Sequence, residues 1–237
     1  MSASIAPLRM PAPGGRRARW DADPYTRALR AGRGPLFLRS TTGWLLPLDV
    51  ERWCAEPDDA DLTVLARCGG AVLDVGCGPG RLVTALAVRG HRALGIDVSP
   101  EAVRRTARTG GPALMRSVFE PLPGEGRWDT ALLIDGNIGI GGDPAALLRR
   151  MADITRPAGS LIVETLPPDV DDDIDEYVQV HLDDCRGRYG EVFPWARLGP
   201  RPLIRYAAAA GWTPSDAWTR SGRRFVTLAL TDTGDER

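Results

Sequence analysis

The sequence predicts an α/β fold in which helices cover both faces of a mostly parallel β-sheet. Short apolar segments that suit buried strands alternate with helix-like segments between residues 71 and 163, joined by short connections. A glycine-rich turn at residues 76–80 directly follows the first of these strands, as in sheets that bind a ligand at their carboxyl edge. The 237 residues, 43% of them hydrophobic, suit one large domain with one substantial core.

Three parts are expected along the chain. Residues 1–20 are rich in Pro, Gly, Ala and Arg and cannot bury enough apolar surface to offset their ordering entropy, so we expect a mobile tail. Residues 21–69 are expected to form a helical arm or lid. Residues 70–237 are expected to form the main domain, with a β-hairpin insertion at about residues 169–198.

The arm opens on a helix signal. Asp23 suits an N-cap, Pro24 suits the first helical position, and Gly32 suits the stop, so the spacing predicts a helix between them. The other arm elements are expected to be two short extended pieces or an apolar flap at residues 36–38 and 44–47, and a helix at residues 58–67.

Two helices of the main domain carry the same start signal, an N-cap followed by proline, at Ser99 and Asp143. A third helix is expected at residues 81–88, stopped by Gly90. The expected strands are the apolar segments at residues 71–75, 93–96, 113–118, 130–134 and 160–163.

The pattern changes after residue 168. An acidic run at residues 169–176 precedes two expected antiparallel strands, 177–182 and 189–195. A helix at about residues 201–210 and a closing hairpin, with strands at 213–220 and 223–230, complete the expected elements.

Composition limits the partners. Thirty Lys and Arg against thirty-one Asp and Glu give a net charge of −1, so there is no overall basic field to attract nucleic acid or an anionic membrane. No signal peptide or membrane-spanning segment is evident, which favours a cytoplasmic location. The four Cys show no C-x-x-C spacing and only two His accompany them, so we expect no metal site. The sequence does not indicate an oligomeric state.

The most informative segment reads VLDVGCGPGR, from Val72 to Arg81. Glycines at alternate positions let the backbone approach a ligand where a Cβ would collide. Asp97 ends the next expected strand, where a carboxylate can accept hydrogen bonds from both hydroxyls of a ribose. The strand, loop, helix, strand and acid together predict a nucleoside-binding site.

The spacing separates classes of nucleotide. A dinucleotide site needs glycine three positions after Gly78, and this chain has Arg81 there. A P-loop needs Lys, and all thirty cations of this chain are Arg.

VLDVGCGPGR together with GIDVSPEAV is similar to the first two motifs of class I S-adenosylmethionine (SAM)-dependent methyltransferases. The similarity continues in outline through WDTALLIDGNIG and RPAGSLIVE to the closing hairpin. The resemblance implies a Rossmann-like fold with a seven-stranded, mostly parallel sheet whose last strand is antiparallel. It also implies that SAM is the cofactor of the domain at residues 70–237.

The same resemblance implies positions around SAM. Asp97 would hold the ribose hydroxyls and Asp135 would lie beside the methionine group and the transferring methyl. The family often has an Asp contacting adenine where this chain has Val118, so adenine is left to apolar and backbone contact, with Glu120 as a substitute. The cofactor-binding residues implied are Tyr25, Asp74, Gly76, Cys77, Gly78, Gly80, Asp97, Val98, Val118, Phe119 and Asp135.

A second glycine-rich loop follows the fourth strand. Asp135 and Asn137, the one Asn of the chain, are the catalytic candidates, and Asn137 also suits substrate binding or a left-handed turn among glycines. Glu164 at the end of the fifth strand could be a base or a solvated cap. Trp195, among the aromatic residues of arm and insertion, could help to form an apolar acceptor pocket.

These features predict a SAM-dependent methyltransferase with a small-molecule acceptor, in bacterial specialised metabolism. Two alternatives keep SAM: an enzyme of another reaction type, such as a cyclase or decarboxylase, and a non-catalytic SAM-binding protein. A dehydrogenase is a third alternative, which Arg81 disfavours.

Overall fold

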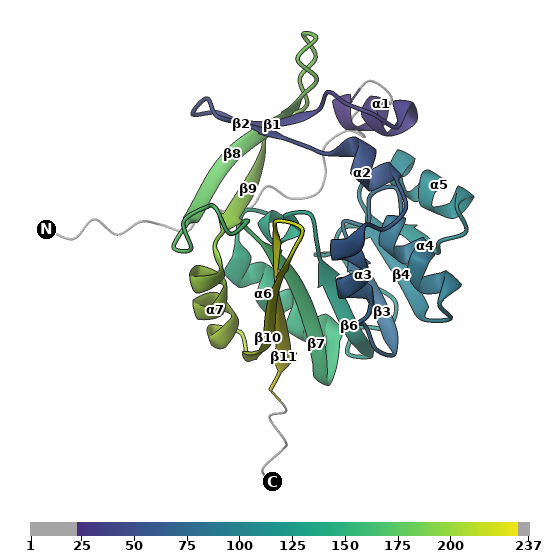
Figure 1. The fold of residues 1–237 in the computed structure, drawn as a ribbon, viewed down its shortest axis with the longest axis vertical. Helices are drawn as coiled ribbons and strands as arrows, with labels where there is room; N and C mark the ends of the chain where they lie inside the picture. The colour runs from purple at the N-terminus through teal and green to yellow at the C-terminus, as the bar shows by residue number, and fades with distance from the viewer. Residues whose placement is uncertain (1–22, 232–237) are drawn as a thin grey trace, which may run out of the picture.

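The computed structural model describes residues 23–231, which form two β-sheets with seven helices around them. The expected tail at residues 1–20 and the first two residues of the arm lie outside this range. A seven-stranded sheet forms the body of the molecule, and a four-stranded sheet lies across one end of it, at the top of Figure 1.

The large sheet has the order β10-β11-β7-β6-β3-β4-β5. Its strands are β3 (Ala71–Val75), β4 (Arg92–Asp97), β5 (Ala113–Met115), β6 (Trp128–Leu133), β7 (Thr155–Thr165), β10 (Trp212–Arg220) and β11 (Arg223–Leu230). The five strands from β7 to β5 run parallel, and the last strand lies antiparallel between β7 and β10. The predicted fold class is therefore confirmed.

Helices cover both faces of this sheet, since its central strands are apolar on both sides. Along β3, Val72 packs into the cluster formed with α3 and α4, whereas Leu73 and Val75 pack into the cluster formed with α6 and α7. These helices are α3 (Asp59–Leu65), α4 (Arg81–Val88), α6 (Pro144–Ile154) and α7 (Pro200–Ala209), while α5 (Pro100–Arg108) packs on β4, β5 and α4.

The first helix of the arm begins and ends where its capping residues predict. Helix α1 (Pro24–Ala31) starts at Asp23, whose Oδ2 accepts the Thr26 N–H at 3.4 Å, and ends at Gly32 with φ +67°. The arm continues with β1 (Phe37–Ser40), β2 (Leu45–Pro47) and α2 (Val50–Cys54), and the sequence signals did not predict α2.

The insertion and the arm form one sheet together. Strands β8 (Asp175–Asp183) and β9 (Phe193–Leu198) pair antiparallel, and β1 adds to the free edge of β8, giving the order β2-β1-β8-β9. We call this four-stranded sheet the roof. It joins segments more than 130 residues apart in the chain, so the insertion is more than an isolated hairpin.

Several expected strands have other bounds in the structure: the strand expected at 160–163 is β7, which spans residues 155–165, and two others are limited by local turns. The strand expected at 189–195 begins at Phe193, because Asp183 and Asp184 accept backbone N–H bonds from Cys185 and Arg186 and hold a local turn before it. Strand β5 ends at Met115 instead of residue 118. There the Ser117 N–H donates to the Glu120 carboxylate in another local turn.

Arginines from three elements form ion pairs with four of the six carboxylates in the acidic run at residues 169–176. Among the described residues, the partners of its carboxylates lie on α7, β9 and β11. The ion pairs join Asp172 to Arg224, Asp173 to Arg201, Asp175 to Arg205, and Glu176 to Arg197. The run is therefore a solvated, ion-paired connection into β8.

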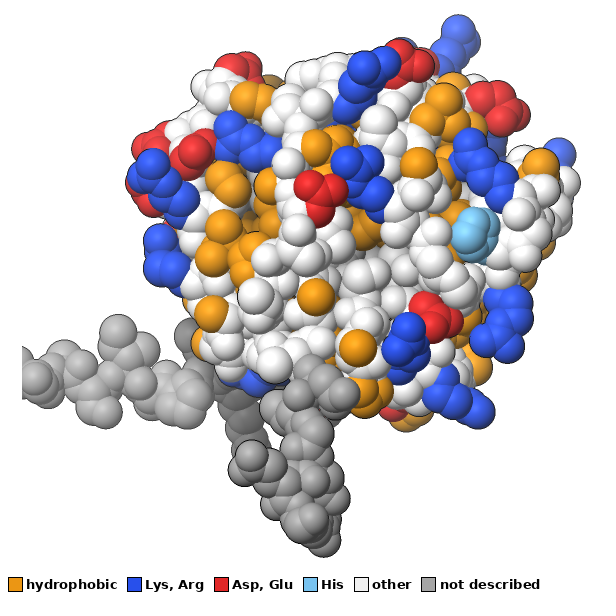
Figure 2. Space-filling view, turned by 60° about the horizontal axis from the view of Figure 1, so that its bottom comes forward, with side chains coloured by type: hydrophobic (Ala, Val, Ile, Leu, Met, Phe, Trp, Pro, Cys, Tyr) orange, Lys and Arg blue, Asp and Glu red, His pale blue; other side chains and the backbone are white. Residues whose placement is uncertain are grey.

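Acidic and basic side chains are interspersed on the face shown in Figure 2, with no continuous field of one sign there. Among residues 23–231, none of the helices has the length and apolarity needed to cross a membrane.

Candidate functional site

A cavity of about 720 Å³ lies between the carboxyl end of the large sheet and the roof. Its floor comes from the loops after β3, β4, β5 and β6, and its upper wall from the arm and from the segment that enters β9. Ligands gather at this edge of open α/β sheets because the strand order changes direction there. Most of the predicted site residues line this cavity, and Gly80, Phe119 and Glu164 do not.

The three alternating glycines of the loop are needed for two different reasons. A Cβ on Gly76 would lie 2.6 Å from the Asn137 amide, and a Cβ on Gly80 would lie 2.4 Å from Thr106 of α5. A Cβ on Gly78 would meet a single atom within 4 Å, the Tyr25 hydroxyl at 3.4 Å. Thus Gly76 and Gly80 make room for side chains of the protein, while Gly78 keeps the cavity open. Gly80 itself lies outside the cavity lining.

Asp97 holds the glycine loop and also lines the cavity. Its Oδ2 accepts the Gly78 N–H at 3.0 Å and its Oδ1 accepts the Ser99 N–H at 2.8 Å. Burial raises the pKa of this carboxyl to about 6, against the lowering effect of those backbone hydrogen bonds. Each carboxylate oxygen retains a lone pair for a ligand hydroxyl.

Asp74 is buried in the cavity wall, with 3% of its surface exposed. No described residue donates a hydrogen bond to its side chain. Burial raises its pKa to about 7, and the nearby charge of Asp135 adds to the rise. A buried carboxylate in this state is stabilised by any cation that enters the cavity.

The position expected for adenine is lined by apolar side chains. Ile96, Val98 and Val118 face the cavity, next to Arg116, whose backbone N–H donates to the Asp97 carbonyl. Phe119 lies outside the lining and packs against Gly141 instead. Cys77 contributes to the lining, while its Sγ packs into the space that Gly95 leaves open.

Asp135 sits at the centre of an ion network. Its Oδ1 accepts from Arg52 at 2.8 Å and from Arg223 at 3.2 Å, and its Oδ2 accepts from Arg81 at 2.9 Å. The residue has φ +59°, a conformation that costs energy for a side chain other than glycine. Three guanidinium groups, from α2, α4 and β11, therefore share the Asp135 carboxylate.

Glu164 belongs to the same ion network and contacts both Asp135 and Arg223. Its Oε2 accepts the Asp135 backbone N–H at 2.7 Å, and the Arg223 guanidinium binds both of its oxygens at 2.7 and 2.8 Å. Arg223 also pairs with Asp61, which is fully buried. Glu164 lies outside the cavity lining, so its contacts are with the protein.

Asn137 joins the two loops of the floor. Its side-chain amide donates to the carbonyls of Val75 and Gly76 at 2.8 and 3.1 Å. These carbonyls end strand β3, so Asn137 fixes the entry to the glycine loop while lining the cavity itself.

The upper half of the cavity is apolar and aromatic. Trp195 packs closely over Gly139, where a Cβ would lie 2.5 Å from the indole, and Phe193 meets Trp195 edge to face with centroids 6.1 Å apart. This wall consists of Leu38, Leu48, Trp53, Ile140, Leu182, Tyr189, Val192, Phe193, Pro194 and Trp195. Three other aromatic residues of the arm and the insertion, Phe37, Trp44 and Tyr177, lie outside the lining.

Tyr25 connects the two halves. Its ring meets Trp53 of α2 edge to face, with centroids 6.2 Å apart, and its hydroxyl points toward Gly78. Burial, followed by the charge of Asp97, raises its pKa well above the usual value for a phenol. Tyr25 is therefore a neutral hydrogen-bonding group at neutral pH.

Sequence reasoning missed Arg52, Trp53 and Arg223. Because every cation of the chain is Arg, no choice of Arg over Lys marked the two arginines. Trp53 lies on a five-residue helix too short to show a periodic pattern. The N-cap Asp49, whose side chain accepts the Arg52 N–H, was the available signal for that helix.

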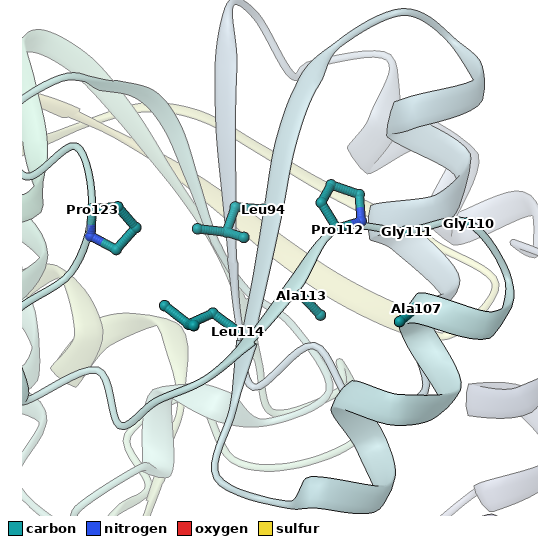
Figure 3. A pocket seen from close by; sticks show the side chains of 8 residues that line it. All are labelled: Leu94, Ala107, Gly110, Gly111, Pro112, Ala113, Leu114 and Pro123. Atoms are coloured by element: carbon teal, nitrogen blue, oxygen red, sulfur yellow. The ribbon is translucent and has the colours of Figure 1, made fainter.

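A second hollow lies at the β5 edge of the large sheet (Figure 3). It is lined by Leu94, Ala107, Gly110, Gly111, Pro112, Ala113, Leu114 and Pro123. None of these eight residues has a polar side chain, so this hollow offers no chemistry. The candidate site is the cavity under the roof.

Comparison with known proteins gives a consistent result. The sequence model of a family described as a methyltransferase domain matches residues 51–213. A ubiquinone biosynthesis O-methyltransferase from Xanthomonas euvesicatoria is 33% identical over 111 residues, which are 44% of this chain and 46% of that protein. The match thus spans about half the length of that curated relative.

Solved structures share the fold. A SAM-dependent methyltransferase from Bacteroides fragilis, in complex with S-adenosyl-L-homocysteine, superposes with a TM-score of 0.75 at 21% identity, over 90% of this chain and 97% of that chain. The 1,6-didemethyltoxoflavin N1-methyltransferase of Burkholderia thailandensis gives 0.53 at 23% identity, over 73% and 77% of the two chains. CalS10, an amino pentose methyltransferase from Micromonospora echinaspora involved in calicheamicin biosynthesis, gives 0.55 at 18% identity, over 76% and 94%.

Proposed function

Because the chain belongs to the methyltransferase domain family, we propose that it transfers a methyl group from SAM to a small-molecule acceptor under the roof. The structural relatives from B. thailandensis and M. echinaspora support the small-molecule acceptor. They also support the proposed place in bacterial specialised metabolism. A cytoplasmic location remains part of this proposal.

The residues of the lower cavity fit SAM. The molecule carries a sulfonium and an ammonium group, and Asp74 is a buried carboxylate facing the cavity with no partner among the described residues. Asp97 has lone pairs free for the ribose hydroxyls, and Val98 and Val118 offer an apolar surface for adenine. Gly78 leaves open the space that the ligand needs.

Bound SAM supplies an electrophilic methyl group. The chain's own contribution is to align the acceptor, to exclude water, and to keep the site rigid. We propose that Asp135, Asn137 and Glu164 act as positioning residues, since the contacts of Asp135 and Glu164 are with the protein and Asn137 holds strand β3. The arm at residues 21–69 is proposed as the lid that brings Tyr25 and Trp53 over the donor.

Asp97 beside the open Gly78 backbone is the observation that carries the proposal, and calorimetry tests it. Wild-type protein should bind SAM and S-adenosylhomocysteine saturably, and Asp97→Asn should weaken SAM by about tenfold or more, because a ribose hydroxyl loses a charge-assisted hydrogen bond. Asp169→Asn, an exposed change outside the lining, is the matched control. A folded wild type that gives no binding heat with either ligand would refute the proposal.

Methyl transfer itself needs a second readout. SAM labelled in its methyl group, incubated with the protein and a metabolite extract, should give a labelled product. Saturable SAM binding without label transfer to any acceptor would instead favour the SAM-using enzyme of another type or the non-catalytic binder.

A further inference from the structure

We propose that the acceptor is an apolar, aromatic molecule that carries a cationic amino group, and that Glu191 and Asp23 at the cavity wall receive this group. The inference rests on the proposed function, because it concerns the acceptor half of the same cavity. Two independent features carry it: the apolar surface of the upper wall, and the distribution of charge around the cavity.

The upper wall suits a flat, apolar body. Leu38 and Leu48 from the arm face the same cavity as Phe193 and Trp195 from the insertion. The edge-to-face pair of Phe193 and Trp195 is fixed by the close approach of Trp195 to Gly139, so the aromatic surface exists before a ligand arrives. Aromatic ligands gain both buried area and ring contacts on such a surface.

The charge around the cavity is negative. Five carboxylates and two guanidinium groups line it: Asp23, Asp74, Asp97, Asp135 and Glu191, with Arg81 and Arg116. Neither arginine belongs to the arm or the insertion, and Arg81 is already paired with Asp61 and Asp135. Arg116 follows β5 and lies beside Asp97. The lining of the acceptor half therefore has acidic side chains without a basic one.

Glu191 and Asp23 supply that acidic character. Glu191 belongs to the exposed segment that enters β9, and no described residue forms an ion pair with it. Asp23 approaches the adjacent Gly190, where a Cβ would lie 3.4 Å from its Oδ1. Asp23 and Glu191, from different elements, thus both line the cavity next to Gly190. Burial raises the pKa of Asp23, because its ionised carboxylate is poorly solvated there. A cation bound beside it would offset this desolvation cost.

The same field disfavours anionic acceptors. A carboxylate or phosphate placed in the upper half would face Glu191 and Asp23 with no basic side chain of the lining in that half. A cation gains attraction from both, more from the partly buried Asp23 than from the exposed Glu191. The site should therefore discriminate by charge among molecules of the same shape.

Three indoles that share the same ring and a two-carbon chain at the same position test this. Tryptamine carries a cation, 3-ethylindole is neutral, and indole-3-propionate carries an anion on the same two-carbon chain. Their affinities would be measured by calorimetry on the full chain saturated with S-adenosylhomocysteine, which fills the donor half and is neutral overall. Tryptamine should bind most tightly and the propionate most weakly, with a ratio of about tenfold or more, or about 1.4 kcal/mol.

Glu191 is the residue to change, because Asp23 also caps α1 and its loss would disturb that helix. Glu191→Gln should reduce the preference for tryptamine over indole-3-propionate by about threefold or more, and Glu191→Arg should reverse it. Glu56→Gln, another exposed glutamate outside the lining, is the matched control and should leave the ratio unchanged.

Three results would overturn the inference: equal or tighter binding of the propionate, an unchanged ratio in both Glu191 variants, or no binding of tryptamine and 3-ethylindole up to their solubility. Binding of S-adenosylhomocysteine is measured in the same samples. If it binds and the charge preference is absent, only this inference fails, whereas absent binding of the nucleoside refutes the proposed function.

Discussion

The buried carboxylate of Asp74 lowers the free energy of unfolding of the ligand-free protein. In the unfolded chain this carboxyl has its ordinary pKa of 3.8, and in the folded protein burial raises the pKa to about 7. Between these values the folded state binds more protons than the unfolded state, so stability falls as pH rises through this window. Above about pH 7 the cost is fully present.

Asp74→Asn should therefore stabilise the free protein while weakening SAM binding. We expect a gain on the order of 2 kcal/mol in the free energy of unfolding at about pH 8, seen as a melting temperature about 5 °C higher. Differential scanning fluorimetry measures the shift, with Asp169→Asn as control. A lower melting temperature for Asp74→Asn would show that its carboxylate has a stabilising partner.

The two raised pKa values also set a pH dependence for SAM binding. Asp97 at about 6 and Asp74 at about 7 become protonated as pH falls, and a cationic ligand binds their ionised forms more tightly. The affinity for SAM should decrease about tenfold or more from about pH 8 to about pH 5.5. Calorimetry in buffers of different ionisation enthalpy should show proton release on binding near pH 6.5. A flat pH profile would contradict the assignment of these two carboxyls.

At the scale of elements, the ion network joins helices α2, α3 and α4 to the ends of β6, β7 and β11. Arg223 of β11 binds Glu164 of β7, Asp61 of α3 and Asp135 after β6. Its side chain and these three carboxylates are buried or largely buried, so each depends on the others for its charge. The network thus fixes the floor of the cavity to the hairpin that ends the fold.

Arg223→Met should cost about 3 kcal/mol or more of unfolding free energy, because it leaves buried carboxylates without their shared cation. Arg220→Met on the same hairpin removes an ion pair in which both partners are more than half exposed. We expect that control to change stability by less than about 1 kcal/mol. Urea denaturation measures both variants, and equal effects would mean that the network contributes no more than a surface pair.

At the scale of the whole molecule, the donor half of the site was largely predictable, whereas in the acceptor half the sequence indicated Trp195 but not the roof that carries it. Gly76, Gly78, Asp97 and Asn137 belong to local strand and loop patterns, and each of them lines the cavity. The contacts of Asp135 and Glu164 were not predictable, since they depend on arginines more than 50 residues away along the chain. The roof depends on the pairing of β1 with β8, and no local pattern encodes a partner so distant.

Binding of a nucleoside should stabilise helices α1 and α2 of the arm. Tyr25 of α1 and Trp53 of α2 lie over the glycine loop, so a bound nucleoside would pack beneath both helices. S-adenosylhomocysteine should slow amide hydrogen exchange in α1 and α2 by about tenfold or more, and it should leave α7, outside the lining, nearly unchanged. Uniform slowing of exchange over the whole chain would indicate global stabilisation alone. Unchanged exchange in α1 and α2 would contradict the placement of the arm over the bound nucleoside.

The pairing of β1 with β8 has a consequence for how new acceptors can arise. The arm and the insertion depend on each other for this contact. Arg39 of β1, in the arm, forms an ion pair with the buried Asp183 of β8, in the insertion, at 2.7 Å. A chimera that receives one segment from a relative would lose the shared edge, whereas a chimera that receives both would keep it. Evolutionary changes of the acceptor should therefore require matched changes in the two distant parts of the gene that encode the arm and the insertion. The SAM-binding segments between them would stay unchanged.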